Sequence, residues 1–290
     1  MRTHLPLYRP PSEAESFILQ ATLGCSWNHC TYCAMYRDRD YQVRPLEAML
    51  ADIQAAGAQG GEAVRHVFVA DGDPLGMAFE LWEPLLLALG TAFPRLRRVS
   101  TYATARNLLE KTPEQLRRLR ELRLSLLYLG PESGDDATLL RLAKGGTVAD
   151  HVAAAQRARA AGMDQSLMFL LGAGGKEHSE AHARASGRLA SAMDPRFVST
   201  LTLTVVPRTP LATQEAQGRF ELPEVAGLLQ ELAWFVEETH LTDGIFRANH
   251  ASNYLPIGGR LPRDREAILA TIHEALAGRT PLRPEWMRGL

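Results

Sequence analysis

The stretch Leu23-Gly24-Cys25-Ser26-Trp27-Asn28-His29-Cys30-Thr31-Tyr32-Cys33-Ala34-Met35-Tyr36 holds all three cysteines of this chain of 290 residues. The spacing is Cys-x4-Cys-x2-Cys, and it directly follows an apolar run, residues 17–23, that predicts a strand. Three cysteines are too few, and too odd in number, for a disulfide framework, so we expect a reducing compartment. Three thiolates in one short loop can share a metal centre and leave one coordination position open.

Two kinds of metal centre suit such a loop. Zinc would take Cys25, Cys30 and Cys33 with His29 or another residue as the fourth ligand. A [4Fe–4S] cluster on the same three cysteines would leave one iron free for a small molecule. Zinc sites usually divide their ligands into two separated pairs, and the chain has no second pair, so the pattern favours the cluster.

The rest of the chain alternates apolar runs with longer amphipathic stretches. Strands are predicted at residues 17–23, 66–70, 98–103, 124–129, 165–171 and 197–206, and helices at 45–56, 78–92, from 112 onward, 149–161 and 179–193. This alternation predicts an α/β fold, a partial (β/α)6 TIM-like barrel with a C-terminal α/β extension. The extension is expected to contain helices at 223–239 and 264–277 and a strand at 244–247. We expect one domain, with a lead-in (1–16), the barrel (17–210) and an extension (211–290) packed on the same core.

The composition is that of a soluble globular protein, with 46% hydrophobic and 22% charged residues. It excludes a disordered or collagen-like chain. The formal charge of −1 does not indicate nucleic acid as a partner, although it leaves room for a local basic patch. The N-terminus lacks the apolar segment of a signal peptide, and no apolar run reaches ~18 residues. We therefore predict a cytoplasmic protein with no membrane partner.

The strand followed by three cysteines, with an aromatic residue directly before the last, resembles the radical S-adenosylmethionine superfamily. Its usual pattern is Cys-x3-Cys-x2-Cys, and this chain has one extra residue between Cys25 and Cys30. That spacing resembles a subgroup of small, uncharacterised members in which the extra residue recurs. The likeness extends from about Phe17 to Pro256.

The resemblance implies roles for residues at the ends of the predicted strands. Asp71, Gly72 and Asp73 follow the second strand, where the family binds the methionine amino group. Glu132 and Ser133, after the fourth strand, would contact the ribose or methionine part. The aromatic Tyr32 and the turns at Gly172 and Pro207 would lie near the adenine. Ordinary turns are the alternative for the loops after the second and fourth strands.

Substrate contacts are expected from four residues beyond these turns. Arg208 stands where related sequences often have glycine, and the polar segment 246–256 supplies Asn249, His250 and Asn253. A structural cap that closes the barrel is the alternative for that segment. His178 and His182 lie four residues apart, and we interpret them as part of a solvated helical turn rather than as a metal site.

The resemblance implies an iron–sulfur enzyme that reductively cleaves S-adenosylmethionine and abstracts hydrogen from an unidentified substrate through a 5′-deoxyadenosyl radical. It also implies a one-electron donor of the flavodoxin or ferredoxin type as partner. The lack of further cysteines excludes a second cysteine-ligated cluster, and the short N-terminus argues against a fused cobalamin module. The alternative is a non-catalytic zinc or iron–sulfur module with a structural or electron-transfer role.

Overall fold

Short apolar runs of the sequence become parallel strands, and the central ones are buried on both faces. In β4 (His66–Ala70), four consecutive residues are fully buried, which is typical of a parallel strand covered by helices. The computed structural model describes residues 4–289. These divide into two units, one of residues 4–28, 35–129 and 153–165, and another of 29–34, 130–152 and 166–289.

The first unit contains parallel strands in the order β1-β4-β5-β6. Phe17 pairs with Val67, Val67 with Val99, and Tyr102 with Tyr128. The strands are β1 (Phe17–Gln20), β4, β5 (Arg98–Ala103) and β6 (Leu124–Glu132), and a separate antiparallel pair is formed by β2 (Thr22–Leu23) and β3 (Gln42–Val43). The last three residues of β6 belong to the second unit.

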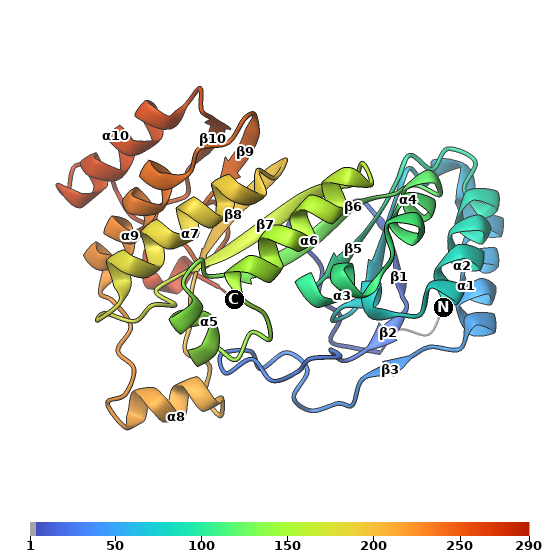
Figure 1. The fold of residues 1–290 in the computed structure, drawn as a ribbon, viewed down its shortest axis with the longest axis horizontal. Helices are drawn as coiled ribbons and strands as arrows, with labels where there is room; N and C mark the ends of the chain where they lie inside the picture. The colour runs from blue at the N-terminus through green and yellow to red at the C-terminus, as the bar shows by residue number, and fades with distance from the viewer. Residues whose placement is uncertain (1–3, 290) are drawn as a thin grey trace. The chain divides into compact units, whose positions relative to one another are not determined.

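Helices of the first unit follow the strands along the chain, and α1 packs against α2 (Figure 1). They are α1 (Leu46–Gly60), α2 (Phe79–Ala92), α3 (Ala105–Glu110) and α4 (Pro113–Glu121), with short 3-10 turns at η1 (Pro11–Glu13), η2 (Gly61–Ala63) and η3 (Pro74–Gly76). Thr112 caps α4, because its hydroxyl accepts a hydrogen bond from the Gln115 amide. The Gln115 side-chain oxygen accepts one from the Thr112 amide. Helix α6 (Val148–Ala160) begins in the second unit and ends in the first.

The second unit contains the strand order β7-β8-β9-β10, with the last pair antiparallel. Its strands are β7 (Asp164–Leu171), which begins in the first unit, β8 (Phe197–Thr202), β9 (Gly244–Arg247) and β10 (Gly258–Leu261). Its helices are α5 (Asp136–Arg141), α7 (Ser179–Met193), α8 (Pro210–Ala216), α9 (Val225–Glu238), α10 (Arg265–Leu276) and the 3-10 turn η4 (Glu285–Met287).

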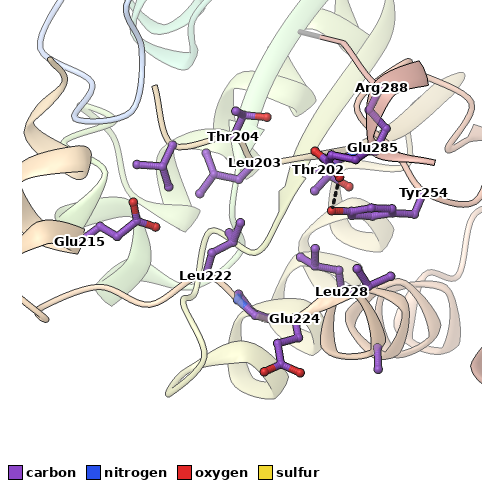
Figure 2. A pocket seen from close by; sticks show the side chains of 14 residues that line it. Thr202, Leu203, Thr204, Glu215, Leu222, Glu224, Leu228, Tyr254, Glu285 and Arg288 are labelled. Carbon is purple, nitrogen blue, oxygen red and sulfur yellow. Dashed lines mark hydrogen bonds and ion pairs between the residues drawn. The ribbon is translucent and has the colours of Figure 1, made fainter. Parts of the chain in front are cut away.

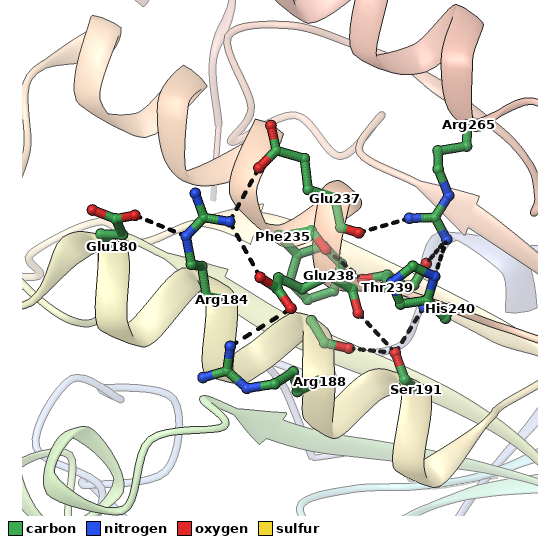
Figure 3. Close-up of polar contacts among 11 residues, drawn as sticks. Glu180, Arg184, Arg188, Ser191, Phe235, Glu237, Glu238, Thr239, His240 and Arg265 are labelled. Carbon is green, nitrogen blue, oxygen red and sulfur yellow. Dashed lines mark hydrogen bonds and ion pairs between the residues drawn. The ribbon is translucent and has the colours of Figure 1, made fainter.

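Helix α9 packs against both α7 and α10 in this unit (Figure 1). Figure 3 shows the polar contacts around it, in which Arg184 of α7 binds Glu237 at 3.1 Å and Glu238 at 3.2 Å. Arg265 of α10 donates to the carbonyl oxygens of Val236 and Glu237, each at 2.8 Å. The two Arg265 bonds give partners to carbonyl groups at the C-terminal end of α9, which have no acceptor role within the helix itself.

The predicted fold class is confirmed, with six strand–helix units in chain order and an α/β extension after them. The strand expected at 17–23 is wrong in part, because it ends at Gln20 and residues 22–23 join a different sheet. The strand expected at 197–206 ends at Thr202. The division into lead-in, barrel and extension stays a prediction. Across residues 4–289, no helix is both long and apolar enough to cross a bilayer.

Candidate functional site

The turn after β4 holds the chain on both sides of Cys25. Asp71 and Asp73 are 0% and 1% exposed. Asp71 Oδ2 accepts from the Gly24 amide at 3.1 Å, and Asp73 Oδ1 accepts from the Ser26 amide at 2.8 Å. The Ser26 hydroxyl also donates to Asp73 Oδ2. Both carboxylates therefore position the first cysteine of the loop.

Gly72 lies between these two aspartates in the chain, and its backbone is in direct contact with the backbone of Gly24 and Cys25. Its amide donates to the Gly24 carbonyl at 3.1 Å. A Cβ atom at this position would lie 2.3 Å from the Gly24 oxygen and 2.6 Å from the Cys25 Cα. Only glycine fits this approach, so the predicted importance of Gly72 has a steric basis.

Burial raises the pKa of both Asp71 and Asp73, and the hydrogen bonds that they accept oppose that rise. Asp71 Oδ1 is buried without a hydrogen-bond partner, while hydrogen bonds from Tyr36 and Gln20 to the carboxyl group act to lower the pKa of Asp71. A buried carboxylate oxygen without a donor is costly to the fold. An ammonium group is a partner of the right charge for it.

In the second unit, the turn from Cys30 to Cys33 is fixed by its backbone. The Cys33 amide donates to the Cys30 carbonyl at 3.3 Å, and the Thr31 amide donates to the Leu142 carbonyl at 2.9 Å. Thr31 in turn accepts from the Leu211 amide at 3.0 Å. The ends of α5 and α8 thus hold the turn that carries two of the cysteines.

Beside this turn lies a buried ion pair that the sequence did not reveal. Lys144 Nζ donates to Glu132 Oε1 at 2.9 Å and to the Tyr32 hydroxyl at 3.4 Å, and the Lys144 and Glu132 side chains are 16% and 9% exposed. Burial acts to lower the pKa of Lys144, but the charge of Glu132 holds it well above its usual value. Burial raises the pKa of the Cys30 thiol, and the charge of Lys144 opposes this. Lys144 therefore offsets part of the effect of burial, but the pKa of the Cys30 thiol stays raised, because Glu132 and Cys33 act in the same direction as burial.

Ser133, predicted to contact the ribose or methionine part of the cofactor, is buried against His182. Its hydroxyl lies 2.8 Å from His182 Nδ1, while His182 Nε2 lies 2.9 Å from the Leu170 carbonyl. The carbonyl can only accept, so Nε2 carries the proton and the Ser133 hydroxyl donates to Nδ1. Burial lowers the pKa of His182 to about 4 and keeps it neutral. The interpretation of His182 as solvated is therefore wrong, whereas His178 is exposed.

Gly172, predicted beside the adenine, has a left-handed backbone with φ +85°. Its amide donates to Glu231 Oε2 at 2.5 Å, and the Ser179 hydroxyl donates to Glu231 Oε1 at 2.6 Å. Glu231 is 0% exposed, and burial raises its pKa to about 7. One buried carboxyl group thus connects the turn after β7 with α7 and α9.

The predicted substrate residues separate into two groups. Arg208 is exposed in the turn after β8, beside the exposed Pro207 that was predicted near the adenine, and Asn249 is exposed as well. Asn253 is 3% exposed and uses its amide fully, since Nδ2 donates to the Thr200 and Ala248 carbonyls and Oδ1 accepts from Thr202. His250 Nδ1 accepts from the Ser252 amide at 3.1 Å. His250 and Asn253 therefore fit the alternative, a cap that braces β8.

Lys144 and Glu231 are the site residues that sequence reasoning missed. A signal existed for the first, because the chain has only three lysines among its 32 basic residues. A lysine kept in a chain that otherwise uses arginine indicates a need for a compact ammonium group. Glu231 gave no such signal, because it lies in an ordinary amphipathic helix.

Comparison with known sequences identifies the family. A sequence model described as the Radical SAM superfamily matches residues 19–185, which is more than half of the chain. The chain belongs to the radical SAM superfamily. Members of this superfamily are enzymes that bind a [4Fe–4S] cluster and S-adenosylmethionine. No curated protein matches the chain.

Solved radical SAM structures share its fold at low identity. The methyltransferase TsrM from Kitasatospora setae, solved with cobalamin and a [4Fe–4S] cluster, is 18% identical with a TM-score of 0.57, over 70% of this chain and 39% of TsrM. Coproporphyrinogen III oxidase HemN from Escherichia coli is 16% identical with a TM-score of 0.56, over 77% and 52%. Methylornithine synthase PylB is 18% identical with a TM-score of 0.53, over 78% and 63%. The chain thus matches less than two thirds of each of these proteins.

The donor set of this radical SAM chain fits the superfamily's cofactors. All three cysteines are free thiols, and the positive charge of Lys144 opposes the rise that burial causes in the pKa of Cys30. Asp71 Oδ1, which has no hydrogen-bond partner, suits an ammonium group. Gly72 has no side chain, so its backbone lies directly against Gly24 and Cys25. Within residues 4–289, no three His, Cys, Asp or Glu side chains converge on the position of a single metal ion. The assignment of Cys25, Cys30 and Cys33 as ligands rests on their spacing and stays a prediction.

Proposed function

We propose that this protein reductively cleaves S-adenosylmethionine and uses the 5′-deoxyadenosyl radical to abstract hydrogen from a substrate. Cys25, Cys30 and Cys33 would hold the cluster. When bound, the cluster would supply the electron that breaks the carbon–sulfur bond and releases methionine, and the hydrogen atom taken from the substrate would complete 5′-deoxyadenosine. The observation that carries the proposal is the anchoring of the cysteine loop, because the buried carboxylates of Asp71 and Asp73 accept hydrogen bonds from the amides on both sides of Cys25.

The residues around the cysteines would bind and orient the cofactor. Asp71 and Asp73 hold the backbone next to Cys25, and Asp71 keeps one oxygen for an ammonium group. Glu132 has a left-handed backbone, φ +67°, which places strain at the end of β6. Strain of this kind is common at binding sites, and it supports a cofactor contact for Glu132. Burial of Tyr32 among apolar residues would exclude water.

Anaerobic reconstitution tests the proposal. We expect about four irons per chain and broad visible absorption. With dithionite and S-adenosylmethionine, mass spectrometry should detect 5′-deoxyadenosine. Cys30→Ala should remove both the iron and the product. A protein with an intact cluster that forms no 5′-deoxyadenosine would refute the proposal.

His29→Ala is the matched control for the zinc alternative. His29 is exposed within the same loop and is the residue that zinc would recruit as a fourth ligand. We expect His29→Ala to keep its iron and its product. A colourless wild-type protein with one zinc, lost in His29→Ala, would favour the non-catalytic module.

The electron donor follows from the chemistry proposed. A cluster of this kind needs a low-potential, one-electron reductant, and we propose a flavodoxin- or ferredoxin-type protein. Replacing dithionite with a reduced flavodoxin should sustain formation of 5′-deoxyadenosine. Activity with dithionite but none with reduced flavodoxin or ferredoxin would contradict this part of the proposal.

A further inference from the structure

The second unit contains a cavity of about 570 Å³ next to the end of β8 (Figure 2). Its walls come from residues 202–205, from the end of α8, the start of α9 and the segment between them, and from Tyr254 and the C-terminal turn η4. Cavities of ~300 to 1,000 Å³ commonly bind small molecules. The carboxyl ends of parallel strands are where α/β barrels bind their ligands.

The apolar floor of the cavity backs directly onto the site described above. Leu222 and Leu228 line the cavity, and a Cβ atom on Gly172 would lie 2.7 Å from the first and 3.0 Å from the second. Leu222 and Val205, another lining residue, pack on the apolar cluster that also contacts Tyr32. The cavity is thus one side chain away from the turn proposed to hold the adenine.

The positive charge of the cavity wall is already neutralised. Arg288 binds Glu285 at 2.6 Å, donates through Nε to the Ser252 carbonyl at 2.8 Å, and lies over the Tyr254 ring at 3.8 Å. The Tyr254 hydroxyl also donates to Glu285 at 2.9 Å (Figure 2). An anionic ligand would have to compete with these contacts for Arg288.

A negative charge remains at the opposite wall. Figure 2 shows the Glu215 side chain reaching toward Leu203 and Leu222, whereas the carboxylate of Glu224 points away from them. Glu215 is exposed at the edge of the cavity, and no hydrogen bond or ion pair joins its carboxylate to another residue within 4–289. A cation in the cavity would therefore find one carboxylate without a partner and an apolar floor below it.

We propose that this cavity binds the substrate, and that the substrate has an apolar body and an ammonium group that pairs with Glu215. The name substrate rests on the proposed function, but the binding itself does not. The apolar body would lie on Leu222, Leu228 and Val205, toward Gly172. The ammonium group would lie at the α8 side of the cavity.

A matched pair of probes tests the charge preference. Phenethylamine and 3-phenylpropionate share a phenylethyl body and carry opposite charges. Both are titrated into the anaerobic holoprotein without reductant, and binding is followed by ligand-observed NMR. We expect a dissociation constant for phenethylamine about tenfold lower than for 3-phenylpropionate.

Three variants place the binding in this cavity. Glu215→Gln should weaken phenethylamine about three- to fivefold and leave 3-phenylpropionate unchanged or tighter. Glu224→Gln, the same change at the carboxylate that points away, should alter neither. Thr204→Trp, which puts a large side chain into the cavity, should abolish binding, with circular dichroism confirming that the variant is folded.

The proposal is overturned if the probes bind equally, if Glu215→Gln and Glu224→Gln behave alike, or if neither probe binds at about 10 mM. None of these results depends on cleavage of S-adenosylmethionine. Failure of the proposed chemistry would instead appear as an absence of 5′-deoxyadenosine in a protein that still binds phenethylamine.

Discussion

At the scale of single residues, Gly72 is the position where the smallest change should do the most harm. In Gly72→Ala, the new methyl group would overlap the Gly24 oxygen and the Cys25 backbone, neither of which can rotate away. We expect a loss of about 1–3 kcal/mol in the free energy of unfolding, together with poor iron incorporation. Urea denaturation and iron analysis measure the two effects.

Gly146→Ala is the control for this prediction. It makes the same chemical change at a glycine whose Cβ would have its nearest neighbours at 3.9 Å. We expect both iron content and stability to stay close to the wild type. Full iron incorporation by Gly72→Ala would show that the contact with Cys25 does not position the loop.

Lys144 offers a second test at this scale, because it neutralises a buried carboxylate. Lys144→Met would leave Glu132 buried without its cation, which typically costs about 3–5 kcal/mol. Lys176→Met removes a cation from Glu221 where both side chains are exposed, so it should cost less than about 1 kcal/mol. Urea denaturation of the two variants compares them directly. Equal losses would mean that the Lys144 pair is not buried in solution.

At the scale of elements, Glu231 joins α9 to α7 and to the turn after β7, and its protonation should set a pH dependence. Its folded pKa of about 7 lies above the usual glutamate value of 4.5, so the folded state holds the proton more tightly than the unfolded state does. This contribution is fully present below pH 4.5 and is lost as the pH rises toward 7. The loss should reach about 3 kcal/mol by pH 8.

Glu231→Gln isolates this effect. Its amide can accept from Gly172 and donate to the Ser179 oxygen, but it does not titrate. We expect the variant to match the wild type near pH 5 and to exceed its stability at pH 8, as measured by urea denaturation at both values. Parallel stability curves for the two proteins would contradict the burial of this carboxyl group.

Elements with strong local patterns were predictable from the sequence, and short ones were not. Strand β4 and helix α7 have the predicted bounds, because a fully apolar run and a clear amphipathic period each stand out. Helices α3, α5 and α8 have six or seven residues, too few to show a period. Strand β10 reads Gly-Gly-Arg-Leu, which carries no strand propensity and is formed by pairing with β9.

The same difference applies to the candidate site. Gly72 and the two aspartates around it could be found because they follow a clear strand. The contact between Gly172 and Glu231 joins residues 59 positions apart, and no local pattern encodes such a pair. Tertiary packing decides which residues pair in this way. The sequence therefore showed where the loops lie, but not which of their polar groups form hydrogen bonds within the protein.

At the scale of the whole molecule, the cofactor should contribute to stability, because a ligand bound only by the folded state stabilises that state. In the absence of the cluster, the burial that raises the pKa of Cys30 favours its neutral thiol, whereas cluster binding uses the thiolate. Oxidation with ferricyanide in the presence of EDTA should therefore lower the Tm by about 10 °C, and anaerobic reconstitution should restore it.

Cys30→Ala separates loss of the cluster from oxidative damage in this experiment. The variant lacks a ligand, so its Tm should already be low and should not change on treatment with ferricyanide and EDTA. Differential scanning calorimetry on the treated and untreated forms of both proteins gives the four values needed. If the wild type keeps its Tm after its iron is gone, the cluster adds nothing to the fold, and the protein's own bonds, among them those of Asp71, Asp73 and Thr31, are enough to hold the loop.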